Sequence, residues 1–201
     1  MKLIIITLEN IIDGEAVVIN ELFRNGLETL HLRKPLSELK DISSLIGQID
    51  SVYHNRIVLH NHYQLTDSFN LKGVHLNRRN PEPPKNEVTS ISRSCHSFEC
   101  LSTYPDYDYL FLSPIFNSVS KSGYGKGFTH EQLRDAKNLG LIDGSVYALG
   151  GITVESIPQV AEYGFGGVAV LGALWENWEH DKNQIALIER FRNFKDACRR
   201  K

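Results

Sequence analysis

The chain lacks a hydrophobic stretch of the kind that enters a membrane. Its first residues, MKLIIITLEN, carry one lysine and a short apolar run that meets acid at Glu9, without the small-residue cleavage site of a secretory signal. A membrane-spanning helix needs about 20 mostly apolar residues. We therefore expect a cytoplasmic protein without a membrane partner.

Cysteine is scarce as well. Cys95, Cys100 and Cys198 form neither a C-x-x-C pair nor an even-numbered secretory framework. An odd number of cysteines favours a reducing compartment, where disulfides are rare. The simplest interpretation is that all three are small thiols, buried or half-buried.

The sequence also lacks an excess of positive charge. Its 22 Lys and Arg residues stand against 24 Asp and Glu, for a net charge of −2, and the basic residues do not gather into long runs. A surface that binds nucleic acid needs clustered Lys and Arg side chains to meet the phosphates. The charge pattern therefore argues against nucleic acid and favours a small metabolite as the partner.

What the sequence does contain is a regular series of short apolar runs with strand-like length, each flanked by polar or turn residues. There are eight of them, at residues 3–7, 29–33, 56–60, 73–77, 91–95, 109–113, 146–150 and 167–171. Segments with helical spacing lie between several of these runs. The clearest are residues 18–23 before Gly26, residues 39–49, the segment opened by a Thr129–Gln132 capping box, and a final stripe that begins near Asp181.

Strands that alternate with helices pair in parallel through right-handed crossovers, and eight such units can close into a barrel. We therefore predict an α/β fold, a compact single-domain (β/α)8 TIM barrel over residues 1–201, with an open doubly wound sheet as the alternative. The fourth unit is expected to have little helix, because residues 79–90 contain three prolines. Oligomeric state is not predicted.

Polar residues follow the predicted strands, and the active site of such a barrel collects at the carboxyl ends of its strands. Gly150, Gly151 and Gly172 follow the last two strands, where backbone N–H groups could approach a phosphate, although glycines also serve tight turns. The other strand-end residues are Arg33, Lys34, His60, Asn61, His62, residues 77–80, Ser94, His96, Ser113, Ser118, Ser120 and Lys121.

Residues at two of these strand ends point to an anion. Ser118, Ser120 and Lys121 form an S-x-S-K cluster suited to a phosphate. Arg33 closes the apolar run TLHLR, so its guanidinium must reach solvent or pair with an acidic side chain or a ligand.

The histidines divide into two groups. His75 alternates within the fourth strand, which favours a hydrogen-bonded core residue, whereas His60, His62 and His96 lie near the expected mouth. The H-x-H pair at positions 60 and 62 could suggest a metal, but it has no third ligand in register, so we predict no metal ligated by these side chains.

Six segments in order between Leu30 and Leu174, LHLRKP, LKGVHLN, SRSCHSFE, LFLSPIFNSVSKSG, YALGGIT and GGVAVLGAL, resemble the thiamine phosphate synthase and thiazole tautomerase (TenI) family. The most specific are GVHL, CHS, and SPIF followed by S-x-S-K, which corresponds to a family T-x-T-K. The resemblance implies an enzyme that joins hydroxymethylpyrimidine pyrophosphate to thiazole phosphate, giving thiamine phosphate and pyrophosphate.

The resemblance also implies roles for individual residues. Ser118, Ser120, Gly150, Gly151 and the Gly172 backbone correspond to positions that hold the thiazole phosphate. Arg33, Ser94 and Lys121 correspond to positions that face the pyrimidine pyrophosphate, and His31 replaces a pyrimidine-contacting Gln. Lys34 could substitute for a family lysine whose position here is Pro35. We take Arg33, Lys121, His60 and His96 as the candidate catalytic residues.

The sequence departs from the family where Mg²⁺ would bind. Asn61 and Asn80 replace the two metal-binding aspartates, and neutral amides hold Mg²⁺ poorly compared with carboxylates. The metal-free tautomerase, which moves a proton on thiazole carboxylate phosphate, is one alternative, but its usual histidine corresponds to Pro114. The other alternative is a binder of thiazole or thiamine phosphate without catalytic activity.

Overall fold

The computed structural model describes residues 1–104, 106–116 and 127–200, and it has the predicted closed barrel. Eight parallel strands pair in sequence order, and β1 closes the ring against β8. The strands are β1 (Lys2–Ile6), β2 (Thr29–Leu32), β3 (Ile57–Leu59), β4 (Gly73–Leu76), β5 (Ser90–Cys95), β6 (Tyr109–Leu112), β7 (Val146–Leu149) and β8 (Gly167–Val170). All eight predicted runs are therefore confirmed, within one residue at either end.

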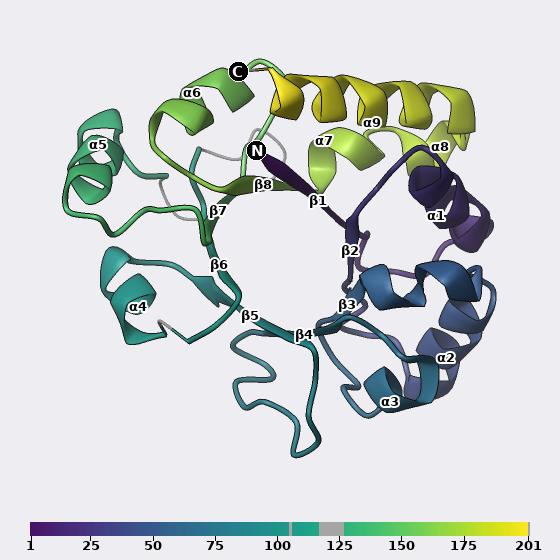
Figure 1. Ribbon diagram of the computed structural model, residues 1–201. Coiled ribbons are helices and arrows are strands. Elements are labelled where there is room, and N and C mark those ends of the chain that lie inside the picture. The colour runs from purple at the N-terminus through teal and green to yellow at the C-terminus, as the bar shows by residue number, and fades with distance from the viewer. Residues whose placement is uncertain (105, 117–126, 201) are drawn as a thin grey trace.

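The helices lie outside the strands, as Figure 1 shows in a view along the barrel axis. The first half contains α1 (Glu15–Arg24), α2 (Leu39–Gly47), the 3-10 helix η1 (Ser51–Arg56), α3 (Leu65–Phe69) and α4 (Phe98–Thr103). The second half contains α5 (His130–Asn138), α6 (Ile157–Glu162), α7 (Gly172–Trp175), α8 (Trp178–Asp181) and α9 (Gln184–Arg199). Within the described residues, no helix is both long and apolar enough to cross a membrane.

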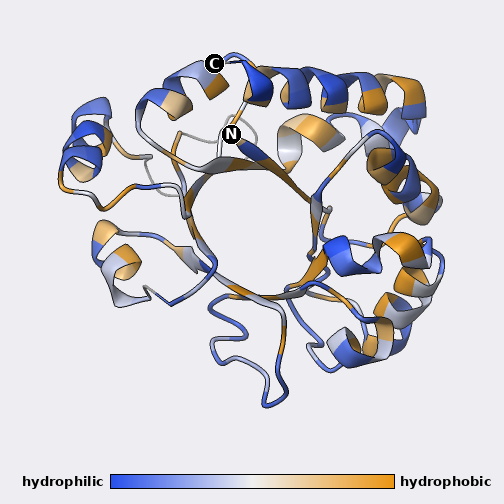
Figure 2. Ribbon diagram, in the orientation of Figure 1, coloured by the Kyte–Doolittle hydropathy of each residue, from blue (hydrophilic) through white to orange (hydrophobic). Residues whose placement is uncertain are grey.

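Local signals explain the helix boundaries. The Thr129 hydroxyl accepts a hydrogen bond from the Gln132 backbone N–H while the Gln132 side chain accepts one from the Thr129 N–H, so the predicted capping box opens α5. No helix connects β4 to β5, where the prolines lie. That connection is an open loop, largely hydrophilic in Figure 2.

The core has two layers. The larger packs the outward side chains of the strands, such as Leu30, Leu110 and Val168, against the helices. The smaller lies inside the barrel and is built from apolar and aromatic residues of β1, β6, β7 and β8, among them Ile6, Phe111 and Tyr147. The rest of the barrel interior is mostly polar, because the inward positions of β2, β4 and β5 include His31, His75, Ser92 and Ser94, and these lie together with His60. The interior is therefore split into an apolar half and an imidazole-rich half.

The cysteines require a correction. Cys95 at the end of β5 and Cys100 in the first turn of α4 form a disulfide with their Cα atoms 5.5 Å apart, whereas Cys198 is free and buried. The short connection from β5 folds directly back into α4, which brings the two residues together in space. The expectation of three free thiols was therefore wrong for two of them, and the odd number of cysteines no longer argues for a reducing compartment.

Candidate active site at the mouth of the barrel

Arg33 is the cationic group that the structure places at the end of β2. Its Nη1 lies 2.9 Å from Glu9 Oε1, and its side chain keeps 24% of its exposure. The Arg33 backbone N–H donates to Thr7 Oγ1 at 3.0 Å, which fixes the turn after β2 against the end of β1. The arginine thus pairs with an acidic side chain, one of the two partners that the sequence predicted, while remaining accessible at the strand end.

Lys34 has a different environment. Its side chain is fully buried, and its ammonium group donates to the Leu8 and Asn10 carbonyls and to both carboxylate oxygens of Glu15 at 2.6–2.9 Å. Burial lowers the pKa of Lys34 and raises that of Glu15, while their mutual attraction opposes both shifts. Because these acceptors occupy all its donors, the substrate-binding role predicted for Lys34 is corrected to a structural one that joins β2 to the start of α1.

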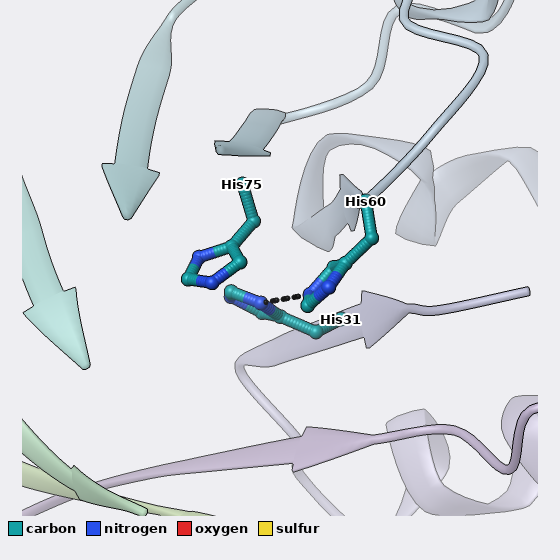
Figure 3. A group of neighbouring side chains, drawn as sticks. All are labelled: His31, His60 and His75. Atoms are coloured by element: carbon teal, nitrogen blue, oxygen red, sulfur yellow. Dashed lines mark hydrogen bonds between the residues drawn. The ribbon is translucent and has the colours of Figure 1, made fainter. Parts of the chain in front are cut away.

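Three histidine side chains meet inside the barrel (Figure 3). Nδ1 of His31 and Nε2 of His60 are 2.9 Å apart, and the His60 and His75 rings stack with centroids separated by 4.4 Å. His31 and His75 are fully buried, and His60 is 7% exposed. His31 Nε2 also lies 2.6 Å from the Tyr109 hydroxyl, so both of its ring nitrogens are hydrogen-bonded within the interior.

The third histidine is the predicted core residue. His75 Nδ1 and Nε2 lie 2.8 Å from the hydroxyl oxygens of Ser92 and Ser94, respectively. Ser94 is one of the predicted binding residues, so the histidine cluster is in direct contact with the candidate site. Burial lowers the pKa of His31 and His60 well below the ordinary value of 6.5, and burial followed by the charges of Arg33 and Arg93 lowers the pKa of His75 to about 3.

The neutral His75 predicts acid sensitivity of the fold. The unfolded chain binds a proton at His75 below its ordinary pKa of 6.5, whereas the folded chain does not until about pH 3. The contribution of neutral His75 to the free energy of unfolding is therefore fully present above pH 6.5 and declines as the pH falls from 6.5 towards 3. Denaturant unfolding in metal-free buffer should therefore show that the wild type loses about 2 kcal/mol more stability between pH 7 and pH 5 than His75→Asn. Equal losses in the two proteins would contradict the buried neutral state.

Asn61 and Asn80 use their amide N–H groups on the backbone. Asn61 Nδ2 donates to the Lys34 carbonyl at 3.1 Å, and Asn80 Nδ2 donates to the His60 carbonyl at 2.9 Å. A carboxylate in either place would face a carbonyl oxygen and repel it. The two asparagines therefore hold strand-end loops together, a role that aspartate could not fill.

The loops after β6 and β7 are joined. Ile115 N–H donates to the Leu149 carbonyl and Phe116 N–H to the Gly150 carbonyl, at 2.9 and 3.1 Å. Gly150 and Gly151 have φ of 97° and 68°, and a Cβ on Gly150 would lie 2.9 Å from the Pro114 Cα. Only glycine fits this close approach, so the turn itself accounts for both glycines, with or without a bound phosphate.

The remaining predicted residues are spread around the mouth or lie outside the described part. Exposed His96 interacts through Nδ1 with the Ser113 carbonyl and hydroxyl, at 2.9 and 3.1 Å, and Gly172 is exposed at the start of α7. His62 interacts through Nε2 with the Ser37 carbonyl, 3.0 Å away, and does not join the interior cluster. Ser118, Ser120 and Lys121 lie outside the described residues, which stop before them at Phe116.

Three residues with contacts to the predicted site residues were not predicted from the sequence: Glu15, which pairs with Lys34, and Ser92 and Tyr109, which contact the histidine cluster. Strand alternation carried a signal for two of them, because Ser92 precedes Ser94 by two residues and Tyr109 precedes Phe111 by two, which places each pair on one face of its strand. Glu15 carried no signal that set it apart from other acidic residues at the start of a helix.

The comparisons with known proteins agree with one another. The thiamine monophosphate synthase family model matches residues 3–174. The thiamine-phosphate synthase of Latilactobacillus sakei is 31% identical over 130 residues, which cover 61% of this chain and 57% of that protein. The Klebsiella pneumoniae enzyme of the same name is 26% identical over 186 residues, covering 85% and 86% of the two chains.

Solved structures extend the likeness over nearly the whole chain. A thiamine phosphate pyrophosphorylase from Bacteroides thetaiotaomicron superposes with a TM-score of 0.89 and 41% identity, covering 98% of this chain and 97% of that one. A protein of the same name from Pyrococcus furiosus has a TM-score of 0.73 at 18% identity, and this more distant likeness shows the shared fold.

Proposed function

The chain belongs to the thiamine monophosphate synthase family, and we propose that it is a transferase of thiamine biosynthesis that condenses hydroxymethylpyrimidine pyrophosphate with thiazole phosphate. The products are thiamine phosphate and pyrophosphate. The near full-length structural match to a thiamine phosphate pyrophosphorylase carries this proposal. The same proposal places the enzyme in the cytoplasm, because charged phosphate esters do not cross a bilayer freely.

The chemistry sets the task for the protein side chains. Pyrophosphate leaves the pyrimidine methylene with the electron pair of the C–O bond, and the thiazole nitrogen then forms the new C–N bond. Negative charge grows on the departing oxygen, so fixed cations and hydrogen-bond donors stabilise the transition state. Arg33 supplies the cation at the end of β2. The Ser94 hydroxyl of β5, which lies 2.8 Å from His75 Nε2, supplies a donor when it rotates from the histidine towards the substrate.

The second substrate is assigned to the other side of the mouth. We assign its phosphate to the backbone of Gly150 and Gly151 with Gly172, together with Ser118 and Ser120, and we assign Lys121 to the pyrophosphate. Phe116, the last described residue before them in the chain, donates its backbone N–H to the Gly150 carbonyl. His96 follows β5 on the exposed rim and remains a candidate for contact with either substrate.

A protein-held Mg²⁺ does not fit the residues present. Mg²⁺ favours carboxylate oxygens in octahedral geometry, whereas the two family metal positions are amides whose N–H groups are committed to the Lys34 and His60 carbonyls. Glu9, the acidic side chain at the end of β1, pairs with Arg33. We therefore derive no step of the reaction through a metal held by these residues.

Binding of each substrate tests the assignment separately from turnover. Isothermal titration should give saturable binding of one thiazole phosphate per chain, with the product thiamine phosphate competing for the same site. The pyrimidine pyrophosphate should bind as well, and more weakly in Ser94→Ala. Binding of thiazole phosphate without any binding of the pyrimidine would support a non-catalytic binder, and binding of neither would contradict the proposal.

A further inference from the structure

His31, His60 and His75 form a cluster of imidazole rings inside the barrel, and the proposed reaction gives these three side chains no joint role. His31 comes from β2, His60 follows β3, and His75 comes from β4, so three neighbouring parallel strands each present one ring to the same interior space (Figure 3). One potential ligand atom from each residue lies within 4.8 Å of the other two. Sequence reasoning paired His60 with His62 instead, because the other partners are about 15 and 29 residues away along the chain.

A hydrogen bond to Tyr109 orients the His31 ring from behind. In the tautomer that donates Nε2–H to the Tyr109 oxygen, His31 keeps a lone pair on Nδ1, directed at His60. His60 can place its hydrogen on Nδ1 and so free Nε2, the atom 2.9 Å from His31 Nδ1. This exchange of tautomer leaves both rings neutral and requires no net loss of a proton.

His75 is oriented in the same way. The Ser92 hydroxyl donates to the Val74 carbonyl, so its oxygen accepts the Nδ1–H of His75. The His75 Nε2 then carries the lone pair and accepts from Ser94. A serine hydroxyl can rotate away, which frees Nε2 without leaving a buried donor unpaired at Nδ1. Histidine ligands of metals characteristically donate their other N–H to such an oxygen, which fixes the ring and the tautomer.

We infer that His31, His60 and His75 form a binding site for a transition-metal dication, with Zn²⁺ as the best match. Neutral imidazole nitrogens suit Zn²⁺, Co²⁺, Ni²⁺ and Cu²⁺, and a set of three such nitrogens without a carboxylate disfavours Mg²⁺ and Ca²⁺. Three protein ligands leave the fourth tetrahedral position to water or to an oxygen of a bound molecule. The site is distinct from the family metal positions at Asn61 and Asn80, and it does not depend on the proposed function.

The geometry needs only small adjustments. Metal–nitrogen bonds of about 2.0–2.1 Å in a tetrahedral site separate the ligand nitrogens by about 3.3 Å. The His31–His60 separation of 2.9 Å therefore opens slightly, and His75 moves inward. Rotations of the imidazole rings about their terminal side-chain bonds supply shifts of this size. The guanidinium of Arg33, whose charge lowers the pKa of both His60 and His75, is paired with Glu9, which reduces its repulsion of a bound cation.

Cobalt is the probe of choice, because four-coordinate Co²⁺ absorbs visible light strongly whereas Zn²⁺ is silent. Protein without a polyhistidine tag is stripped with chelator, freed of the chelator and titrated with Co²⁺ in the absence of substrates. We expect one Co²⁺ per chain with four-coordinate visible bands, and loss of those bands when Zn²⁺ is added. Elemental analysis of the dialysed protein should then give one Zn²⁺ per chain.

Variants locate the ion. His60→Asn and His75→Asn should abolish the bands, with folding checked by circular dichroism. The control is His62→Asn, which alters the neighbouring histidine at a left-handed position that Asn tolerates (φ 53°) and should leave the bands unchanged. Tyr109→Phe retains the three ligands but removes the oxygen behind His31, and it should weaken Co²⁺ binding by about tenfold or more.

Two outcomes would overturn the inference. The first is wild-type protein that acquires no visible bands and retains no Zn²⁺. This result would leave the cluster as a purely hydrogen-bonded part of the core, and it does not depend on whether any variant folds. The second is bands that persist in folded His75→Asn but disappear in His62→Asn, which would place the ion on the H-x-H pair of His60 and His62. Because no substrate is present, neither outcome bears on the synthase proposal.

Discussion

Replacing Lys34 with alanine is expected to lower the free energy of unfolding by about 3–5 kcal/mol, the usual result of removing one partner of a buried ion pair. The substitution leaves the fully buried Glu15 carboxylate without its countercharge, and it strips the Leu8 and Asn10 carbonyls of a donor. Denaturant unfolding followed by circular dichroism measures the effect. Removal of the ammonium group also disconnects the end of β2 from the start of α1. The barrel of the variant should therefore unfold in a single cooperative transition at a lower denaturant concentration.

Two comparison variants identify the cause. Lys40→Ala removes a lysine from an exposed pair with Glu38, where both side chains are more than 70% exposed, and should change stability by no more than about 0.5 kcal/mol. The double variant Lys34→Met with Glu15→Leu removes both charges together and should recover much of the loss. A Lys34→Ala protein as stable as Lys40→Ala would show that the buried pair does not hold this part of the barrel.

Replacing Arg33 with methionine is expected to lower kcat/KM for thiamine phosphate formation by about 100-fold to 1000-fold, the range found when one preorganised group that stabilises developing negative charge is removed. Methionine retains much of the side-chain length, and the pair with Glu9 is partly exposed, so stability should change by about 1 kcal/mol or less. Steady-state kinetics with the two substrates varied separately measures the loss. It should appear mainly in kcat, because the charge develops in the transition state.

The matched control is Arg24→Met on the outer surface of α1. Arg24 also pairs with carboxylates, those of Glu21 and Asp50, but it lies at the end of α1 and not at the carboxyl end of a strand. Its substitution should leave kcat/KM unchanged. Equal activity of the Arg33 and Arg24 variants would remove Arg33 from the reaction.

The fold could be predicted because its signals are local. Each strand is a short apolar run bounded by polar residues, and the capping box at Thr129 and Gln132 marks a helix start without reference to the rest of the chain. The prolines of residues 79–90 likewise correctly predicted a unit without a helix. Eight parallel units can close into a barrel, and pairing of β8 with β1 excludes the open doubly wound sheet that the count alone also allowed.

The candidate site could be predicted only in part, because strand-end position does not fix the direction in which a side chain points. Arg33 and Lys34 are adjacent in sequence, yet one reaches the exposed strand end and the other turns into a buried pair with Glu15. The histidine cluster depends on register between strands, which places His31 beside Val58 and His75 beside Ser92. Pairings of this kind arise from the closed barrel and leave no spacing rule in the sequence.

The decisive measurement is the formation of thiamine phosphate from hydroxymethylpyrimidine pyrophosphate and thiazole phosphate, followed by chromatography with matched arms in Mg²⁺ and in EDTA. We expect thiamine phosphate and pyrophosphate in equal amounts, only when both substrates are present, and much less of both products with Arg33→Met. An absence of product in every arm, from folded protein that binds both substrates, would contradict the proposed synthase activity.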